Sequence, residues 1–194
     1  MSFKKYIQEL SDQKSVVYTF GRFNVMTKGH QSLFEFVAKQ ARKISADGII
    51  FTSLSQNAKK NPLFFSDKIH FMKKVIPRGI SVSNDTSLKN TFQIAEKLVK
   101  DGYTRIQFII GSDRLGDFDT LHKYVNKWSE GKATIEIISF SGKSRVGNYS
   151  GTRMRTLAKE NKFDEFCDDL PKGLTKKEAT DLFSKVRSGL GIKD

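Results

Sequence analysis

The sequence is poor in cysteine and proline, and it contains no long apolar run. Its 194 residues include one cysteine, Cys167, and three prolines. A single cysteine excludes an internal disulfide and a zinc site built from several cysteines, and so few prolines exclude proline-rich and collagen-like chains. No apolar run approaches the roughly 18 residues that a membrane-spanning helix needs. We therefore expect a soluble protein with no membrane partner, in the reducing environment of the cytoplasm.

Acidic residues are also scarce relative to basic ones. The chain has 34 lysines and arginines against 21 aspartates and glutamates, which gives a formal net charge of +13. Such an excess favours a polyanionic partner, which could be a nucleic acid, an acidic membrane or a phosphorylated small molecule. The hydrophobic content of 38%, with 16 phenylalanines, is too high for a disordered basic tail. The positive charge therefore belongs to a folded domain.

Two kinds of apolar segment alternate along the chain. Short segments typical of buried strands lie at 15–20, 48–52, 80–83, 105–110 and 134–140. Segments with helical spacing separate and follow them, at 30–43, 66–76 (with Ser66 as the expected cap), 90–100, 117–128, 151–161, 163–168 and 175–188.

This alternation of strands with helices is typical of βαβ units. We therefore predict an α/β fold that is Rossmann-like and doubly wound, with a mainly five-stranded parallel sheet and a C-terminal helical extension. The α/β domain is expected over residues 1–170, beginning with a helix at 2–10, and the extension over residues 171–194.

Polar residues gather directly after the first predicted strand. Gly21 allows the backbone to turn and to approach a ligand closely. Thr27, Lys28 and His30 then offer a hydroxyl, a cation and an imidazole, and Gly29 between them leaves room for a ligand. A lone loop histidine usually has no function, but this one opens a helix, whose N-terminus favours anions. Because open parallel sheets bind ligands beyond the carboxyl ends of their strands, this segment predicts a phosphate site.

A second candidate segment, Tyr149–Arg155, lies late in the chain. Ser150 and Thr152 stand at the start of a predicted helix, where hydroxyl groups either cap backbone N–H groups or bind phosphate. Arg155 follows one turn later and could reach the same anion as a charged donor. The alternative is an ordinary helix cap beside a surface arginine.

Two further strand ends carry candidate ligand groups. Lys59 and Lys60 follow the second strand, where each either neutralises a phosphate or is simply solvated. Gly111 and Asp113 follow the fourth strand, where the aspartate could accept hydrogen bonds from ribose hydroxyls, cap a helix, or do both.

These segments resemble the motifs of the nucleotidyltransferase superfamily. Residues 21–30, GRFNVMTKGH, resemble the pattern G-x-F-x-x-x-[HT]-x-G-H, with Thr27 in the position where phosphopantetheine adenylyltransferases also carry threonine. Residues 149–155 match the spacing of the second motif, I-S-[ST]-T-x-x-R, in a form similar to archaeal nicotinamide-nucleotide adenylyltransferases. The lysine loop is similar to that of phosphopantetheine adenylyltransferase, and residues 111–113 resemble a G-[AS]-D segment. The resemblance spans about residues 15–170, and the chain looks like small, divergent members found in phages.

The resemblance implies transfer of a nucleotidyl group, favouring AMP from ATP, to a phosphorylated acceptor such as NMN, with release of pyrophosphate. It implies catalytic roles for His30 on the α-phosphate, Thr27 beside it, and Arg155, which holds the leaving phosphates with Ser150 and Thr152. The other implied nucleotide- or phosphate-binding residues are Gly21, Arg22, Phe23, Asn24, Lys28, Gly29, Gly111 and Asp113, with Lys59 and Lys60 as acceptor or phosphate candidates. Mg²⁺ is expected to bind mainly through substrate phosphates, and no protein metal site is expected.

Several alternatives stay open at this point. A cytidylyltransferase or a phosphopantetheine-type adenylyltransferase would share the same motifs. A basic nucleic-acid-binding protein is the alternative from another class, supported by the net charge but by no helix-turn-helix, RNP or zinc-finger pattern. The sequence is compatible with a homo-oligomer.

Overall fold

A computed structural model describes residues 13–118, 120–141 and 149–192, with the backbone alone described at 113, 115 and 117. The helix expected at 2–10 lies outside these residues. One parallel sheet contains the strands β1 Lys14–Gly21, β2 Asp47–Thr52, β3 Ile80–Val82, β4 Tyr103–Gly111 and β5 Thr134–Phe140. Their order in the sheet is β3-β2-β1-β4-β5. The predicted α/β, Rossmann-like, five-stranded parallel sheet is confirmed.

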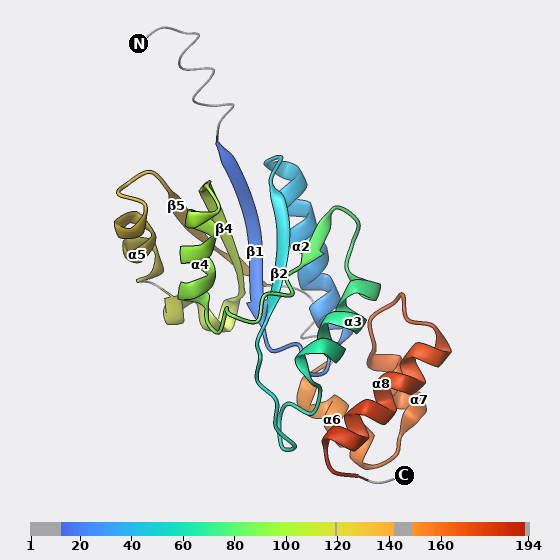
Figure 1. Ribbon diagram of the computed structural model, residues 1–194. Coiled ribbons are helices and arrows are strands. Elements are labelled where there is room, and N and C mark those ends of the chain that lie inside the picture. The colour runs from blue at the N-terminus through green and yellow to red at the C-terminus, as the bar shows by residue number, and fades with distance from the viewer. Residues whose placement is uncertain (1–12, 119, 142–148, 193–194) are drawn as a thin grey trace, which may run out of the picture.

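Helices cover both faces of this sheet (Figure 1). The described helices are α2 Lys28–Lys43, α3 Phe65–Val75, α4 Thr91–Lys100, α5 Leu121–Trp128, α6 Gly151–Lys159, α7 Phe163–Asp169 and α8 Lys176–Gly189. Alternate residues of β1 serve the two faces, because Val16 packs with α4 and α5 while Val17 packs with α2. Burial on both faces explains why this strand is a continuous apolar run in the sequence.

Several helix starts differ from the sequence prediction, and the cause of the difference is clear for two of them. The helix expected to be capped by Ser66 begins at Phe65, because Phe64 is the extended residue that precedes its first turn. The helix expected from 117 begins only at Leu121, because the 3₁₀ segment η1, Ser112–Phe118, occupies the chain directly after β4.

The last three helices lie beyond the carboxyl ends of the strands (Figure 1). Their apolar residues Met154, Phe166 and Leu182 belong to one buried cluster with Phe34 of α2 and Phe71 of α3. This cluster fixes the start of α6 next to the sheet edge at which α2 begins.

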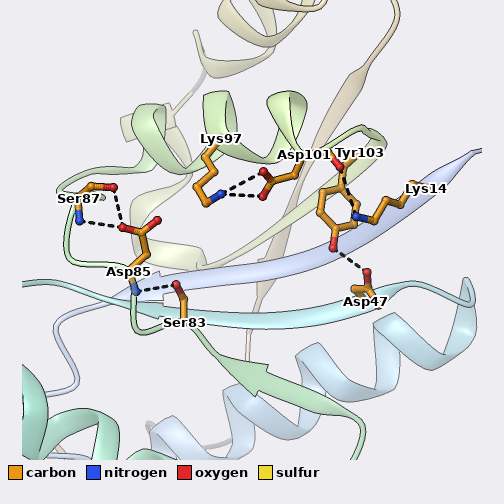
Figure 2. A network of polar contacts seen from close by, with 8 residues as sticks. All are labelled: Lys14, Asp47, Ser83, Asp85, Ser87, Lys97, Asp101 and Tyr103. Atoms are coloured by element: carbon orange, nitrogen blue, oxygen red, sulfur yellow. Dashed lines mark hydrogen bonds and ion pairs between the residues drawn. The ribbon is translucent and has the colours of Figure 1, made fainter.

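At the opposite end of the sheet, where the strands begin, polar contacts join the strands to one another (Figure 2). The Tyr103 hydroxyl at the start of β4 donates to the Asp47 carboxylate at the start of β2, at 2.6 Å. Lys14 of β1 lies 4.0 Å from the centre of the Tyr103 ring, and Lys97 pairs with Asp101 at 3.0 Å. Lys14 and Lys97 at this end of the sheet therefore have an aromatic and an acidic partner within the protein.

Candidate functional site

A pocket of about 310 Å³ lies at the carboxyl ends of β1 and β4. The chain runs outward from β1 through β2 to β3, and then returns to place β4 on the other side of β1. The gap between β1 and β4 is thus the topological switch point of the sheet, where the helices leave to opposite faces and ligands bind in open α/β folds. Gly21 and Gly111, the last residues of these two strands, both line the pocket.

The pocket brings together residues predicted from four separate segments of the sequence. Nine of the predicted residues line it: Gly21, Arg22, Phe23, Asn24, His30, Lys60, Gly111, Thr152 and Arg155. Five others do not line it, namely Thr27, Lys28, Gly29, Lys59 and Ser150. Asp113 lies in η1, and its side chain is outside the described part of the chain.

Thr27 and His30 interact at the start of α2. The backbone N–H of Thr27 donates to Nδ1 of His30 at 3.1 Å, and the Thr27 hydroxyl oxygen lies 3.2 Å from the same nitrogen. A backbone N–H can only donate, so Nδ1 carries no proton and the neutral ring is protonated at Nε2. Because His30 lines the pocket, its Nε2–H is the ring donor that a ligand there would meet. Thr27 is buried and contacts His30, and it does not itself line the pocket.

Burial keeps the His30 ring neutral, since it lowers the pKa of the imidazole from 6.5 to about 4. The uncharged ring keeps one donor, its Nε2–H, which can still hydrogen-bond an anion. The Phe23 ring supports it edge-on, with ring centres 5.1 Å apart and planes at 90°. Gly21 makes room for Phe23, because a Cβ on Gly21 would lie 2.6 Å from that ring.

This pKa predicts that acidification destabilises the protein between pH 6.5 and 4. The unfolded histidine binds a proton near pH 6.5 and the folded one only near 4, so the contribution is present above pH 6.5 and is lost as the pH falls. We expect His30 to account for about 2–3 kcal/mol of that loss. Urea unfolding at a series of pH values should show a smaller acid loss in His30→Gln than in wild type, whereas exposed His70→Gln should follow wild type. An equal loss in His30→Gln would contradict the assignment.

Arg155 is held at the pocket wall by two hydrogen bonds. Its guanidinium donates to the Asn24 carbonyl oxygen at 3.2 Å and to the Thr152 hydroxyl at 3.0 Å. Gly151 permits this approach, because a Cβ there would lie 3.2 Å from both Arg155 Nη1 and the Asn24 carbonyl oxygen. The contact joins the β1–α2 connection to the first turn of α6.

The side chain of Asn24 is used within the protein. Its amide donates to the Leu63 carbonyl at 3.0 Å and its Oδ1 accepts from the Leu63 N–H at 3.1 Å. Asn24 therefore joins the β1–α2 connection to the segment before α3. It lines the pocket, but both ends of its amide are already hydrogen-bonded to Leu63.

Positive charge dominates the described lining of the pocket. Its charged side chains are Arg22, Lys60, Arg114 and Arg155. Burial, and then the neighbouring Arg22, lower the pKa of Arg155. Among the described residues, neither Arg22 nor Arg155 has an ion-pair partner. Like charges held together in this way are stabilised when an anion binds between them.

Ser150 caps a helix, which is one of the two roles that the sequence allowed for its hydroxyl group. Its side chain accepts from the backbone N–H of Arg153 at 3.1 Å and so caps α6. The next two residues, Gly151 and Thr152, line the pocket. The first turn of α6 therefore reaches the pocket even though the capping hydroxyl does not.

A tight turn separates the two neighbouring lysines after β2. Asn57 and Asn61 pair across it, and the Lys60 backbone N–H donates to Asn57 Oδ1 at 2.8 Å. Lys60 lines the pocket and Lys59 does not.

Because only Lys60 of this pair lines the pocket, substitutions of the two lysines should affect anion binding differently. Lys60→Ala is expected to weaken the binding of inorganic tripolyphosphate to the pocket about tenfold, the scale of losing one charged contact to phosphate. Lys59→Ala is the matched control and should leave the dissociation constant unchanged. Titration calorimetry of both variants tests this, and equal effects of the two substitutions would refute the assignment.

Arg114 and Lys68 are two cations of this region that the sequence reasoning missed. Arg114 lines the pocket directly after the Gly111–Asp113 segment, and its guanidinium lies 5.3 Å from the centre of the Phe118 ring. Its place just past a strand end was the available signal. Lys68 is buried in α3 beneath the β1–α2 connection, and in the sequence it resembles an ordinary helical lysine.

None of the described helices is both long and apolar enough to cross a membrane. No group of three or more histidine, cysteine or acidic side chains is arranged to hold a metal ion in that same part of the chain.

The solved structures that are similar to this chain include one with a TM-score above 0.5 and two with lower scores. A Vibrio parahaemolyticus protein provisionally assigned as a nicotinate-nucleotide adenylyltransferase is similar over 94% of this chain and 98% of its own, with a TM-score of 0.57 and 17% identity. A Streptococcus pneumoniae macrolide-efflux protein (TM-score 0.48, 17% identity) matches over 82% of this chain and 65% of its own. Thermotoga maritima TmcAL bound with alpha-thio ATP (TM-score 0.45, 12% identity) matches over 88% and 55%. No protein-family model and no curated protein sequence matches the chain.

Proposed function

We propose that the protein is a nucleotidyltransferase that transfers a nucleotidyl group, AMP from ATP in the favoured case, to a phosphorylated acceptor such as NMN and releases pyrophosphate. The observation that carries this proposal is the pocket at the switch point, where His30 lies with Arg22, Lys60 and Arg155. The fold shared with the Vibrio protein, which is named for an adenylyl transfer, supports the same reaction class.

The chemistry requires positioning and charge stabilisation more than a protein nucleophile. An acceptor phosphate oxygen attacks the α-phosphorus in line and forms a new oxygen–phosphorus bond. The bond to the bridging oxygen breaks, and pyrophosphate leaves with that electron pair. In this reaction the Nε2–H of His30 donates to an α-phosphate oxygen, while Arg155 and Thr152 bind the leaving pyrophosphate.

The remaining predicted residues take indirect or secondary roles in this proposal. Thr27 orients His30, and Ser150 caps the helix that presents Thr152 and Arg155. Arg22 and Lys60 neutralise further phosphate charge. Asp113 stays the proposed acceptor for the ribose hydroxyls, with Gly111 allowing the nucleoside to approach the end of β4.

Magnesium enters the proposal as part of the substrate, the Mg²⁺ complex of the nucleoside triphosphate. The described pocket lining contains no carboxylate, so its donor set does not suit a hard cation held by the protein alone. The metal is therefore expected to bind through phosphate oxygens and water.

A crossed substrate screen tests the proposed function. ATP and CTP are each combined with NMN, phosphopantetheine, FMN and glycerol phosphate, with pyrophosphate release and product mass as readouts. We expect pyrophosphate and a dinucleotide product with ATP and NMN. A product with CTP or with phosphopantetheine would instead assign one of the alternative transferases. Absence of pyrophosphate from every pair, together with a salt-dependent gel shift of DNA or RNA, would overturn the proposal in favour of nucleic-acid binding.

A further inference from the structure

Lys68 is a buried cation that the proposed reaction does not use. It stands on α3 with 1% of its surface exposed. Its ammonium donates to the Ser53 carbonyl oxygen and, at 3.5 Å, to the Arg22 carbonyl oxygen. Thr52 also donates to the Arg22 carbonyl, from its hydroxyl at 3.2 Å. Lys68 thus joins the ends of β1 and β2 directly behind a residue that lines the pocket.

No carboxylate among the described residues compensates this charge. On its own helix, Asp67 pairs instead with Lys185 of α8 at 3.1 Å. The β1–α2 connection brings Arg22, another cation, and the end of β2 brings only the neutral Thr52 and Ser53. A buried ammonium that has only carbonyl partners destabilises the fold compared with an apolar side chain of similar length.

We propose that Lys68 is a positioning residue of the nucleotide site, which holds the β1–α2 connection in the conformation that presents Arg22 and His30 and adds buried positive charge behind a bound triphosphate. This inference rests on the proposed function, in that the anion is taken to be a nucleoside triphosphate. A methionine could fill the same space with less cost to folding. We therefore assign the charge of Lys68 a role in binding the anion and not in stabilising the fold.

The protonation of Lys68 gives this role a measurable consequence. Burial lowers the pKa of its ammonium from 10.5 to about 8. A triphosphate bound nearby favours the charged form and raises that pKa again. Binding near pH 9 must then take up protons, and the affinity for triphosphate must fall as the pH rises above 8.

The experiment compares wild type with Lys68→Met, Lys68→Arg and the control Lys73→Met, whose lysine is exposed on the same helix. Titration calorimetry with MgATP and with inorganic tripolyphosphate, at pH 7.5 and 9 in buffers of different ionisation enthalpy, gives affinity and proton uptake. Thermal unfolding of each variant gives stability. At pH 7.5 we expect Lys68→Met to be at least as stable as wild type but to bind MgATP about tenfold more weakly. It should also lose the proton uptake that wild type and Lys73→Met show at pH 9. Lys68→Arg should bind with little pH dependence.

Each outcome decides for or against a stated proposal. Wild-type affinity and uptake in Lys68→Met would overturn the role of Lys68 and leave the proposed function standing. If wild type binds the anion at pH 9 without taking up protons, the role of Lys68 is overturned by that measurement alone. If wild type binds tripolyphosphate but not MgATP, the proposed function fails, and the same comparison with tripolyphosphate still decides on Lys68. Binding of neither anion would overturn both.

Discussion

His30→Ala is expected to lower turnover by about 10²–10³, the scale of losing one preorganised donor to a transition-state oxygen. The variant removes the Nε2–H that the Thr27 backbone N–H fixes by occupying Nδ1. It should remain folded, because the apolar core around Phe23 and Phe34 does not depend on the imidazole. Single-turnover measurement of pyrophosphate release is the direct readout.

The controls for this prediction use the same residue type. His70→Ala removes an exposed imidazole from α3 and should leave the rate unchanged. His30→Gln restores an N–H donor of similar reach and should recover part of the rate. A folded His30→Ala variant with nearly wild-type turnover would remove His30 from the mechanism.

Arg155→Met is expected to lower kcat/KM for the nucleoside triphosphate by about 10²-fold, the effect of removing a partly buried, charge-assisted donor. The loss has two sources. The guanidinium no longer meets the leaving pyrophosphate, and the Asn24 carbonyl loses the contact that ties the β1–α2 connection to α6. Methionine keeps much of the side-chain length, so α6 should still form.

Two companion variants sharpen the Arg155 prediction. Arg155→Lys keeps the charge but not the pair of hydrogen bonds, and should fall between wild type and Arg155→Met. Arg78→Ala removes an exposed arginine elsewhere and should have no effect. An unchanged kcat/KM in Arg155→Met would show that the substrate phosphates do not contact this side chain.

The sequence was sufficient to predict the sheet because its central strand is covered on both sides. Val16, Val17 and Tyr18 are all fully buried, so this strand is a continuous apolar run bounded by polar residues. The position of the pocket followed from the same pattern, since polar residues after the ends of parallel strands must meet at one edge. The sequence therefore predicted that His30 and Gly111 lie at this end of the sheet, where both line the pocket.

Which side chain enters the pocket depended on tertiary contacts that the sequence does not display. The Asn57–Asn61 pairing separates the positions of Lys59 and Lys60, although the two lysines are adjacent and chemically identical. The amide of Asn24 bonds to Leu63, 39 residues away. Lys68 resembled a surface residue because its partners, Ser53 and Arg22, lie 15 and 46 residues away in the chain.

The structure shows where part of the net charge of +13 lies. Part of it converges on one pocket, through Arg22, Lys60, Arg114 and Arg155. Other cations form ion pairs within the protein, such as Lys74 with Glu178 at 3.0 Å and Arg153 with Asp169 at 2.6 Å. This convergence supports the proposed compact phosphorylated ligand over an extended polyanion.

The most direct test of nucleotidyl transfer follows the two ends of the triphosphate separately. The protein is incubated with NMN and with ATP labelled at either the α- or the γ-phosphate, and the products are separated. The proposed reaction places the α label in the dinucleotide and the γ label in pyrophosphate. Transfer of the γ label to the acceptor, or release of labelled inorganic phosphate in place of pyrophosphate, would contradict it.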